Sequence, residues 1–308
     1  MLQYLIILLD ETSTSFCHYE NPKKERTLMP LETLKQSIRF GMMENLMIQY
    51  VYPDYELPEE YKEVIESIDH SKIKPMAEDA DVLVLNKMEL VQTDIPVVLR
   101  IGKKDLFAYQ EEVADMLKRT PRLNVVLTGV ETFTDEDFDA YKKVLAALSA
   151  KVEKLYVEGK SPQLNLLTDR MMLSQMNNCG AGDTTITLAP NGKFYVCPAF
   201  YYENEADSIG DLEHGLDIKN KQFYKLAYAP ICRHCDAWQC KRCIWLNRKT
   251  TQEVNTPSHE QCVVAHLERN ASRELLQNIR KHGTFLPEQE EIKEIDYLDS
   301  FDIRDTWQ

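Results

Sequence analysis

Cysteine spacing constrains this chain more than any other feature of its sequence. Seven of the eight cysteines lie between positions 179 and 262. Four of them form the run CRHCDAWQCKRC, in which two C-x-x-C pairs are separated by four residues. A C-x-x-C pair can direct two thiolates at one metal centre from a single turn. The spacing therefore predicts a metal or iron–sulfur site built from Cys179, Cys197, Cys232, Cys235, Cys240, Cys243 and Cys262.

A disulfide framework is the competing interpretation of these cysteines. The N-terminal stretch MLQYLIILLDETS lacks a basic region and a small-residue cleavage site, and its apolar run is too short to span a bilayer. We therefore expect a cytoplasmic protein with reduced thiols, where clustered cysteines are more typical of metal binding. The net charge of −14 argues against nucleic acid or an anionic membrane as a partner.

Strand-like and helix-like patterns alternate across the first half of the chain, which favours an α/β fold with a parallel sheet. Amphipathic stretches predict a helix after Pro30 with Met42 on its apolar face, one after Pro58, one through Tyr109 and one capped by Thr134. The pattern leaves an open sheet and a partial barrel as alternatives, and the connection NKMELVQTD is too short for a crossover helix. Short apolar runs predict strands at 2–9, 47–52, 82–85, 97–101, 124–130 and 155–157.

The second half begins with a predicted linker at 161–175. Pro190-Asn191-Gly192 then predicts a hairpin that brings Cys179 and Cys197 together. A helix is expected after Cys262, ending near Gly283, with Val264, Leu267, Leu275 and Ile279 on its apolar face. An acidic run such as 288–305 is usually a solvated tail. Apolar residues recur in it at Ile292, Ile295, Leu298 and Phe301, so the alternative is a helix that docks on its own barrel or on a partner.

The cysteine region resembles a SPASM domain, the auxiliary cluster domain of radical SAM peptide-modifying enzymes. The resemblance covers about ninety residues and includes Gly192-x4-Cys197, although Cys235-x4-Cys240 and Cys240-x2-Cys243 are each one residue shorter than the family's usual spacing. It implies two 4Fe–4S clusters, the first bound by Cys179, Cys197 and Cys243. The second would be bound by Cys232, Cys235, Cys240 and Cys262.

Zinc is the alternative metal, because it also takes four thiolates. Seven thiols leave one of two sites a ligand short. The eighth ligand of two zinc sites would be His234, His259 or His266, and His266 lies one helical turn after Cys262.

The same resemblance implies a radical SAM-type partial (βα)6 barrel before the SPASM domain. Its C-x3-C-x2-C motif should follow the first strand, but this chain carries Asp10, Thr14 and Cys17 at those spacings. The stretch VYPDYELP stands where a Gly-Gly-Glu motif should be. We therefore expect a degenerate barrel that binds no S-adenosylmethionine, has no catalytic or cofactor-binding residues, and does no radical SAM chemistry.

The combination resembles the CXXX repeat peptide maturase family. This second resemblance implies an accessory protein in the maturation of a ribosomally made peptide. The accessory protein would bind the precursor peptide, relay electrons to an active radical SAM partner, or do both. A self-sufficient enzyme that uses an open auxiliary cluster and a zinc-stabilised binding module are the alternatives. The expected domains are a barrel at 1–160, the linker at 161–175, the SPASM domain at 176–268, and a helix with an acidic tail at 269–308.

Overall fold

The computed structural model describes residues 1–293, and these form two compact units. Unit 1 contains residues 1–84 and 179–233, and unit 2 contains residues 85–178 and the described residues from 234 onward. Both units are built on mainly parallel strands covered by helices, so the fold is mixed α/β. The predicted apolar positions Ile295, Leu298 and Phe301 lie outside the described residues.

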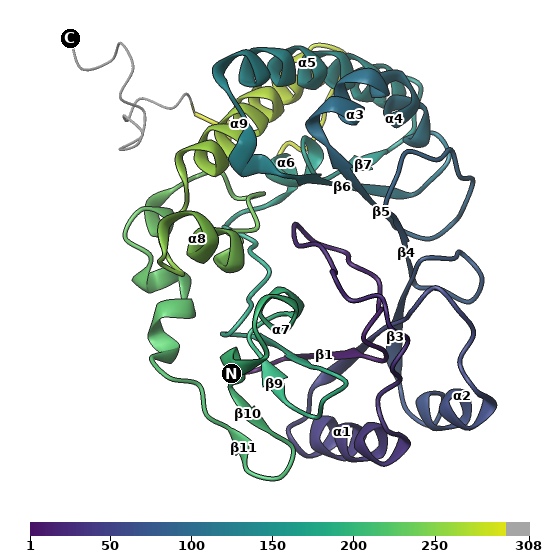
Figure 1. The fold of residues 1–308 in the computed structure, drawn as a ribbon. Coiled ribbons are helices and arrows are strands. Elements are labelled where there is room, and N and C mark those ends of the chain that lie inside the picture. Colours follow the sequence, from purple (N-terminus) through teal and green to yellow (C-terminus); the bar gives the residue numbers. More distant parts are fainter. Residues whose placement is uncertain (294–308) are drawn as a thin grey trace. The chain divides into compact units, whose positions relative to one another are not determined.

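Unit 1 is organised around the parallel strands that flank β1. Their order is β4-β3-β2-β1-β8-β9, with β9 antiparallel to β8, and a second ribbon pairs β10 with β11. Helices α1 and α2 lie on one side of β1 to β3 (Figure 1). The strands are β1 (Tyr4–Leu8), β2 (Met47–Val51), β3 (His70–Lys74), β4 (Val82–Leu85), β8 (Thr185–Leu188), β9 (Phe194–Tyr195), β10 (Gly210–Asp211) and β11 (Gly215–Leu216), and the helices are α1 (Leu31–Met43), α2 (Glu59–Ile65) and α7 (Pro198–Glu203).

Unit 2 places a long helix over three parallel strands, in the order β7-β6-β5. Helices α3, α4 and α5 cover these strands on one side, and α9 packs along α5 (Figure 1). The strands are β5 (Val97–Gly102), β6 (Arg122–Thr128) and β7 (Gln163–Leu164), and the helices are α3 (Lys103–Ala108), α4 (Gln110–Met116), α5 (Asp135–Val157), α6 (Thr168–Met172), α8 (Ile244–Thr251) and α9 (His259–Arg280).

Short 3-10 helices connect these elements. They are η1 (Val130–Thr132) in unit 2, η2 (Glu205–Asp207), η3 (Lys221–Tyr224) and η4 (Leu226–Tyr228) in unit 1, and η5 (Cys232–His234), which contains the unit boundary.

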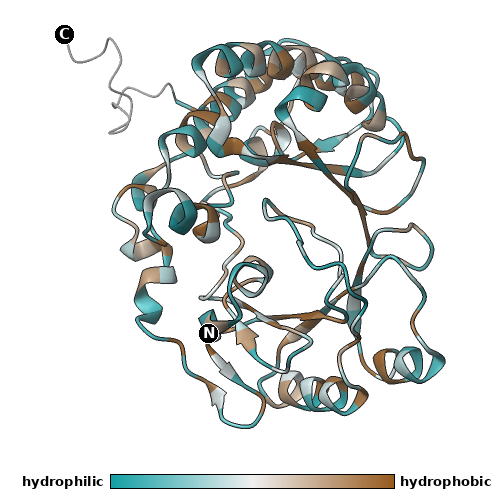
Figure 2. Cartoon of the chain, viewed as in Figure 1, coloured by the Kyte–Doolittle hydropathy of each residue, from teal (hydrophilic) through white to brown (hydrophobic). Residues whose placement is uncertain are grey.

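Local sequence signals explain several element boundaries. Thr134 and Asp137 form a reciprocal capping box at the start of α5, with Thr134 N 2.8 Å from Asp137 Oδ2. The predicted hairpin at Asn191-Gly192 is present as β8 and β9, and Gly192 has φ +75, which a side chain would disfavour. Apolar residues predominate in strands such as β1, β5 and β6, whereas the helices mix apolar and polar residues (Figure 2).

Two predicted helical features are wrong. Met42 was placed on the buried face of α1, but its side chain is 65% exposed. Leu34 and Ile38 are buried as predicted, and Gly41 is buried beside them. A Cβ at Gly41 would lie 2.7 Å from Ile48 Cδ1, so glycine lets α1 approach β2 closely. The single helix through Tyr109 is two helices, α3 and α4, which meet at this exposed residue.

Two predictions about strands are also wrong. Residues 155–157 are the end of α5, because Leu148, Val152 and Leu155 continue its buried face at helical spacing. Strand β3 was missed because its sequence, HSKIK, is polar. The Lys72 amine sits in that strand with ion pairs to Glu66 at 2.5 Å and Asp79 at 2.8 Å, which compensate its burial.

Two further segments can be compared with the secondary structure predicted from the sequence. Residues 86–96, all described, contain no helix, in agreement with the expected irregular connection. The predicted linker at 161–175 contains β7 and α6. Within residues 1–293, no helix is both long and apolar enough to cross a membrane.

Candidate metal centre

The predicted metal ligands are divided between the two units. Cys179, Cys197 and Cys232 belong to unit 1, whereas Cys235, Cys240, Cys243 and Cys262 belong to unit 2. Each predicted ligand set therefore includes residues of both units. Within the described residues, no three His, Cys, Asp or Glu side chains are grouped closely enough to hold a metal ion.

Backbone amides donate hydrogen bonds to two of the thiols in unit 2. Ala237 N lies 3.4 Å from Cys235 Sγ, and Arg242 N lies 3.4 Å from Cys240 Sγ. In both cases the donor is two residues after the cysteine, and Arg242 reaches this position with φ +45. An N–H group that points at sulfur favours the thiolate, which is the form that binds metal. Both contacts therefore favour the thiolate form of these cysteines.

His266 contacts the first of these thiols. Its Nε2 lies 3.6 Å from Cys235 Sγ, and His266 is on α9 one turn after Cys262. His266 was one of three histidines considered as an eighth ligand from the sequence. The structure places His266 in contact with Cys235, which is a predicted metal ligand.

Two buried arginines fix the loop that carries Cys235. Arg170 from α6 donates from Nε to the Asp236 backbone oxygen at 2.6 Å, and Arg269 from α9 donates from Nη2 to the Asp236 carboxylate at 2.6 Å. The Arg170 guanidinium also stacks on Trp238, 3.9 Å from the ring centroid. Burial lowers the pKa of Arg170, an effect that Asp236 and Cys235 oppose. The cations favour a negatively charged thiolate at Cys235.

The next residues of the loop are attached to the core of unit 2. Gln239 is buried and donates from Nε2 to the Ala265 oxygen at 2.8 Å and to Glu268 at 3.4 Å. Glu268 accepts a 2.8 Å hydrogen bond from the Tyr141 hydroxyl of α5. Burial raises the pKa of Glu268 to about 7, although both hydrogen bonds act in the opposite direction. The cysteine loop is therefore tied to α5 and α9.

The loop after β1 in unit 1 holds the three residues at the radical SAM cysteine spacing. Asp10 is fully buried, and its carboxylate accepts hydrogen bonds from the Thr12 amide at 2.7 Å, the Thr12 hydroxyl, and the Tyr55 hydroxyl at 2.7 Å. Burial and this bond to Asp10 raise the pKa of Tyr55. Thr14 is buried and Cys17 is half-buried. Asp10 therefore has a structural role in the loop.

Further polar contacts fix the same loop. Ser13 Oγ donates to the Val51 oxygen at 2.8 Å, and Asn21 Nδ2 donates to the oxygens of Glu11 and Ser13, both at 2.9 Å. The Lys23 amine pairs with Glu205 at 2.5 Å. Tyr19 is buried close to Cys17 and Cys197. Burial is the main cause that raises the pKa of Tyr19, and the two cysteines raise it further. The loop is held by its own side chains.

Two thiols of unit 2, Cys235 and Cys240, receive amide hydrogen bonds, and Cys235 also lies near the Arg170 cation and the His266 imidazole. Iron–sulfur clusters and zinc both accept this donor chemistry. Sequence reasoning missed Arg170, Asp236, Gln239 and Arg269, and no local signal could have identified them, because their partners are 26 to 66 residues away.

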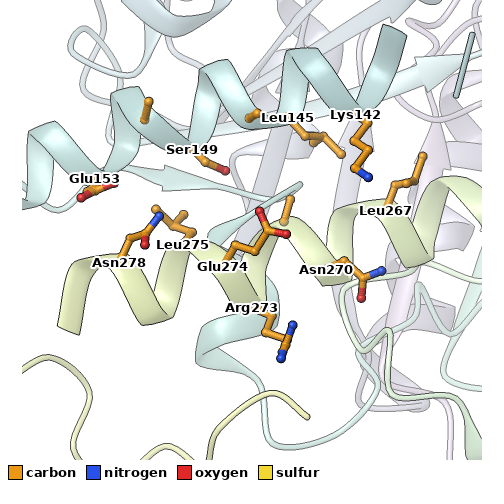
Figure 3. Close-up of a pocket in the computed structure, with 13 residues that line it drawn as sticks. Lys142, Leu145, Ser149, Glu153, Leu267, Asn270, Arg273, Glu274, Leu275 and Asn278 are labelled. Carbon is orange, nitrogen blue, oxygen red and sulfur yellow. The ribbon is translucent and has the colours of Figure 1, made fainter. Parts of the chain in front are cut away.

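A hollow of about 370 Å³ lies between α5 and α9. Leu145, Leu267 and Leu275 are among its apolar walls, and Figure 3 shows Ser149 directed from α5 toward α9. The Ser149 hydroxyl is buried and has no hydrogen-bond partner among the described residues. Both charge signs line the hollow, from Lys142, Arg273, Glu153 and Glu274.

Comparison with known proteins identifies the fold. No family model matches the chain, and no curated protein matches it. The solved structure of histidine-tagged anSMEcpe with bound AdoMet matches with a TM-score of 0.65 at 12% identity, over 91% of this chain and 100% of that one. Native anSMEcpe with bound AdoMet and Cp18Cys peptide matches with a TM-score of 0.61 at 12% identity, over 91% of this chain and 99% of that one.

These similarities concern the fold alone. The mixed α/β fold, with its mostly parallel strands, is similar to that of anSMEcpe.

Proposed function

We propose that this protein is an accessory maturase: a catalytically degenerate relative of radical SAM enzymes that binds a precursor peptide and assists an active radical SAM partner. The observation that most directly supports the proposal is the hydrogen bonding of the Asp10 carboxylate. This carboxylate stands where the first cluster cysteine is expected, and its contacts to Thr12 and Tyr55 commit it to holding the loop. Only Cys17 of the three positions offers a thiol.

The domain organisation proposed with this role is a partial barrel over 1–160, a SPASM domain over 176–268 and a C-terminal helix and tail. The SPASM cysteines would hold two 4Fe–4S clusters, which supply electron transfer when bound. The amide–sulfur contacts of Cys235 and Cys240 support thiolate ligation there. The bound Cp18Cys peptide in the anSMEcpe structure supports peptide binding by a protein of this fold.

We take the hollow between α5 and α9 as a candidate surface for peptide binding. Apolar walls offer burial for a side chain, and the unpartnered Ser149 hydroxyl offers a hydrogen bond. Ala271→Trp should fill the hollow and weaken peptide binding, measured by calorimetry. Ala147→Trp, at an exposed position of α5 that does not line this hollow, is the control.

The direct test of the degenerate barrel is S-adenosylmethionine cleavage. Anaerobically purified, reduced protein with its metal content determined should produce no 5′-deoxyadenosine. The same protein should increase peptide modification by its active radical SAM partner. Production of 5′-deoxyadenosine, or of modified peptide without the partner, would support the self-sufficient enzyme and remove the accessory role.

A zinc-stabilised binding module is the second candidate, and the Cys235–His266 contact favours it. An imidazole beside a thiolate is a common donor pair for zinc. Elemental analysis separates the two candidates, because brown protein with bound iron indicates clusters, whereas colourless protein with stoichiometric zinc indicates the module.

A further inference from the structure

The segment that joins β11 to the cysteine run carries positive charge in an acidic protein. Residues 217–233, called here the basic segment, contain four lysine or arginine residues and one carboxylate, whereas the whole chain has 36 cations of this kind and 50 carboxylates. The carboxylate, Asp217, pairs with Lys219 at 2.6 Å. All of these residues belong to unit 1. A local charge opposite to the net charge of the protein favours a negatively charged ligand at that place.

Two aromatic side chains of the basic segment face solvent. Phe223 on η3 is 45% exposed and Tyr228 on η4 is 58% exposed, and these two 3-10 helices contact each other. Within residues 1–293, the exposed aromatic side chains are these two and Tyr109. Lys219 and Lys225 of the same segment are exposed as well. Exposed aromatic rings that lie close together are typical of the contact surfaces of proteins.

The backbone that carries these rings is anchored. Tyr224 packs on Gly182, because a Cβ added to that glycine would lie 2.6 Å from Tyr224 Cγ, and Gly182 has φ +76. Ala229 is fully buried. Phe223 precedes Tyr224 and Tyr228 precedes Ala229, so each exposed ring is next to an anchored residue. A surface that is already ordered loses little conformational entropy when a ligand binds, which favours affinity.

The chemistry of the basic segment selects among negatively charged ligands. Lysine ammonium groups attract carboxylates, and exposed rings offer contact to aliphatic or aromatic side chains. A short peptide with both kinds of side chain matches both features. Nucleic acid and anionic bilayers extend beyond the segment and meet the remainder of a protein whose net charge is −14, whereas a short peptide interacts mainly with charges within the Debye length of about 8 Å. The segment therefore favours an acidic peptide.

We propose that the basic segment binds an acidic stretch of the precursor peptide that also carries apolar side chains. Phe223 and Tyr228 contact the apolar side chains, and Lys219 and Lys225 contact the carboxylates. The identity of the peptide as a precursor rests on the proposed function, whereas the binding itself does not. The basic segment is in unit 1 and the hollow between α5 and α9 is in unit 2, so separate substitutions test the two surfaces.

Fluorescence anisotropy on the full-length protein tests this surface with three labelled synthetic peptides. The probe is a four-fold repeat of Glu-Glu-Leu-Phe, and the comparison peptides are four-fold repeats of Glu-Glu-Ser-Gly and Lys-Lys-Leu-Phe. We expect the probe to bind at least about tenfold more tightly than either comparison peptide, because only the probe offers both contacts. Its affinity should fall as the salt concentration rises, since exposed charges are screened.

Two double variants separate the apolar contact from the charge contact. Phe223→Ser with Tyr228→Ser should weaken probe binding by about tenfold or more, since aromatic side chains at the centre of an interface carry much of its affinity. Lys219→Glu with Lys225→Glu should weaken it to a similar extent and remove the loss of affinity with salt.

The matched control is Tyr109→Ser with Lys104→Glu, an aromatic residue and a lysine at exposed positions of unit 2. This variant should bind the probe as the parent does. Thermal unfolding checks that each variant keeps the parental melting temperature, which we expect because every substituted side chain is exposed.

Equal binding of the two acidic peptides, or probe binding that both double variants leave unchanged, would overturn the proposal. Vesicles of phosphatidylserine and phosphatidylcholine and a single-stranded RNA are compared in the same assay. Tighter binding of either than of the probe, with the same loss in the variants, would assign the segment to a membrane or to nucleic acid instead. Failure of the probe to bind with retained partner assistance removes this surface and leaves the accessory function. Probe binding without partner assistance leaves the surface and removes the accessory function.

Discussion

The Arg269 guanidinium is buried against the Asp236 carboxylate, with Nη2 2.6 Å from Oδ2 and Nε 3.1 Å from the same oxygen. Arg269 is 1% exposed and belongs to α9, while Asp236 directly follows Cys235. Together with the contacts of Arg170, this ion pair fixes the loop of a predicted metal ligand against the helix that carries Cys262 and His266.

Asp236→Ala should destabilise the protein by about 3–5 kcal/mol, because it leaves Arg269 buried without its counter-charge. Urea unfolding measures the change. Glu158→Ala is the control, since this residue forms an exposed pair with Lys154 at 3.9 Å and should change stability by about 0–1 kcal/mol. Equal effects of the two substitutions would show that the Asp236 pair does not hold the loop.

Asp10→Ala tests the polar loop after β1. The substitution removes the acceptor for the Thr12 amide and the Tyr55 hydroxyl, and hydrogen bonds to a charged group contribute about 1.5–3 kcal/mol each. We expect a loss of about 3 kcal/mol in the free energy of unfolding. Asp54→Ala, at an exposed carboxylate that pairs with Arg26 at 3.6 Å, should be nearly neutral. A neutral Asp10→Ala variant would mean that the carboxylate is available for another role.

Glu268 predicts a specific pH dependence. Because burial raises its pKa to about 7, the folded protein favours the protonated acid, whereas the unfolded chain titrates near its ordinary value of about 4.3. Its contribution to stability is complete below the unfolded pKa and is lost as pH rises through about 7. Glu268→Gln should therefore reduce the fall in stability between about pH 5 and pH 8. Exposed Glu274→Gln on the same helix should leave that fall unchanged.

The sequence predicted the secondary structure correctly where the local residue pattern agrees with the burial of the side chains. The run from Leu5 to Leu8 predicted β1, and Thr134 with Asp137 predicted the start of α5. Strand β3 was missed because Lys72 is stabilised there by Glu66 and Asp79, a compensation that hydrophobic periodicity cannot register.

The sequence predicted the donor residues of the site. It did not predict the residues that hold those donors in place. Cys235 and His266 were both candidates from residue type and spacing, but the contact between them depends on how α9 packs. Arg170 and Arg269 looked like ordinary helix cations in the sequence. Their burial against Asp236 arises from contacts 33 and 66 residues apart in the chain.

Cys235→Ser should lower metal content and stability together, because the binding free energy of a metal is folding free energy when the unfolded chain has no site. Serine cannot supply the thiolate that the Ala237 amide and His266 approach at 3.4 and 3.6 Å. Cys17→Ser is the matched control, since Cys17 belongs to unit 1 and to neither predicted ligand set, so it should keep full metal content. Elemental analysis and thermal unfolding are measured on the same samples. A Cys235→Ser variant with parental metal content and melting temperature would exclude this cysteine as a ligand.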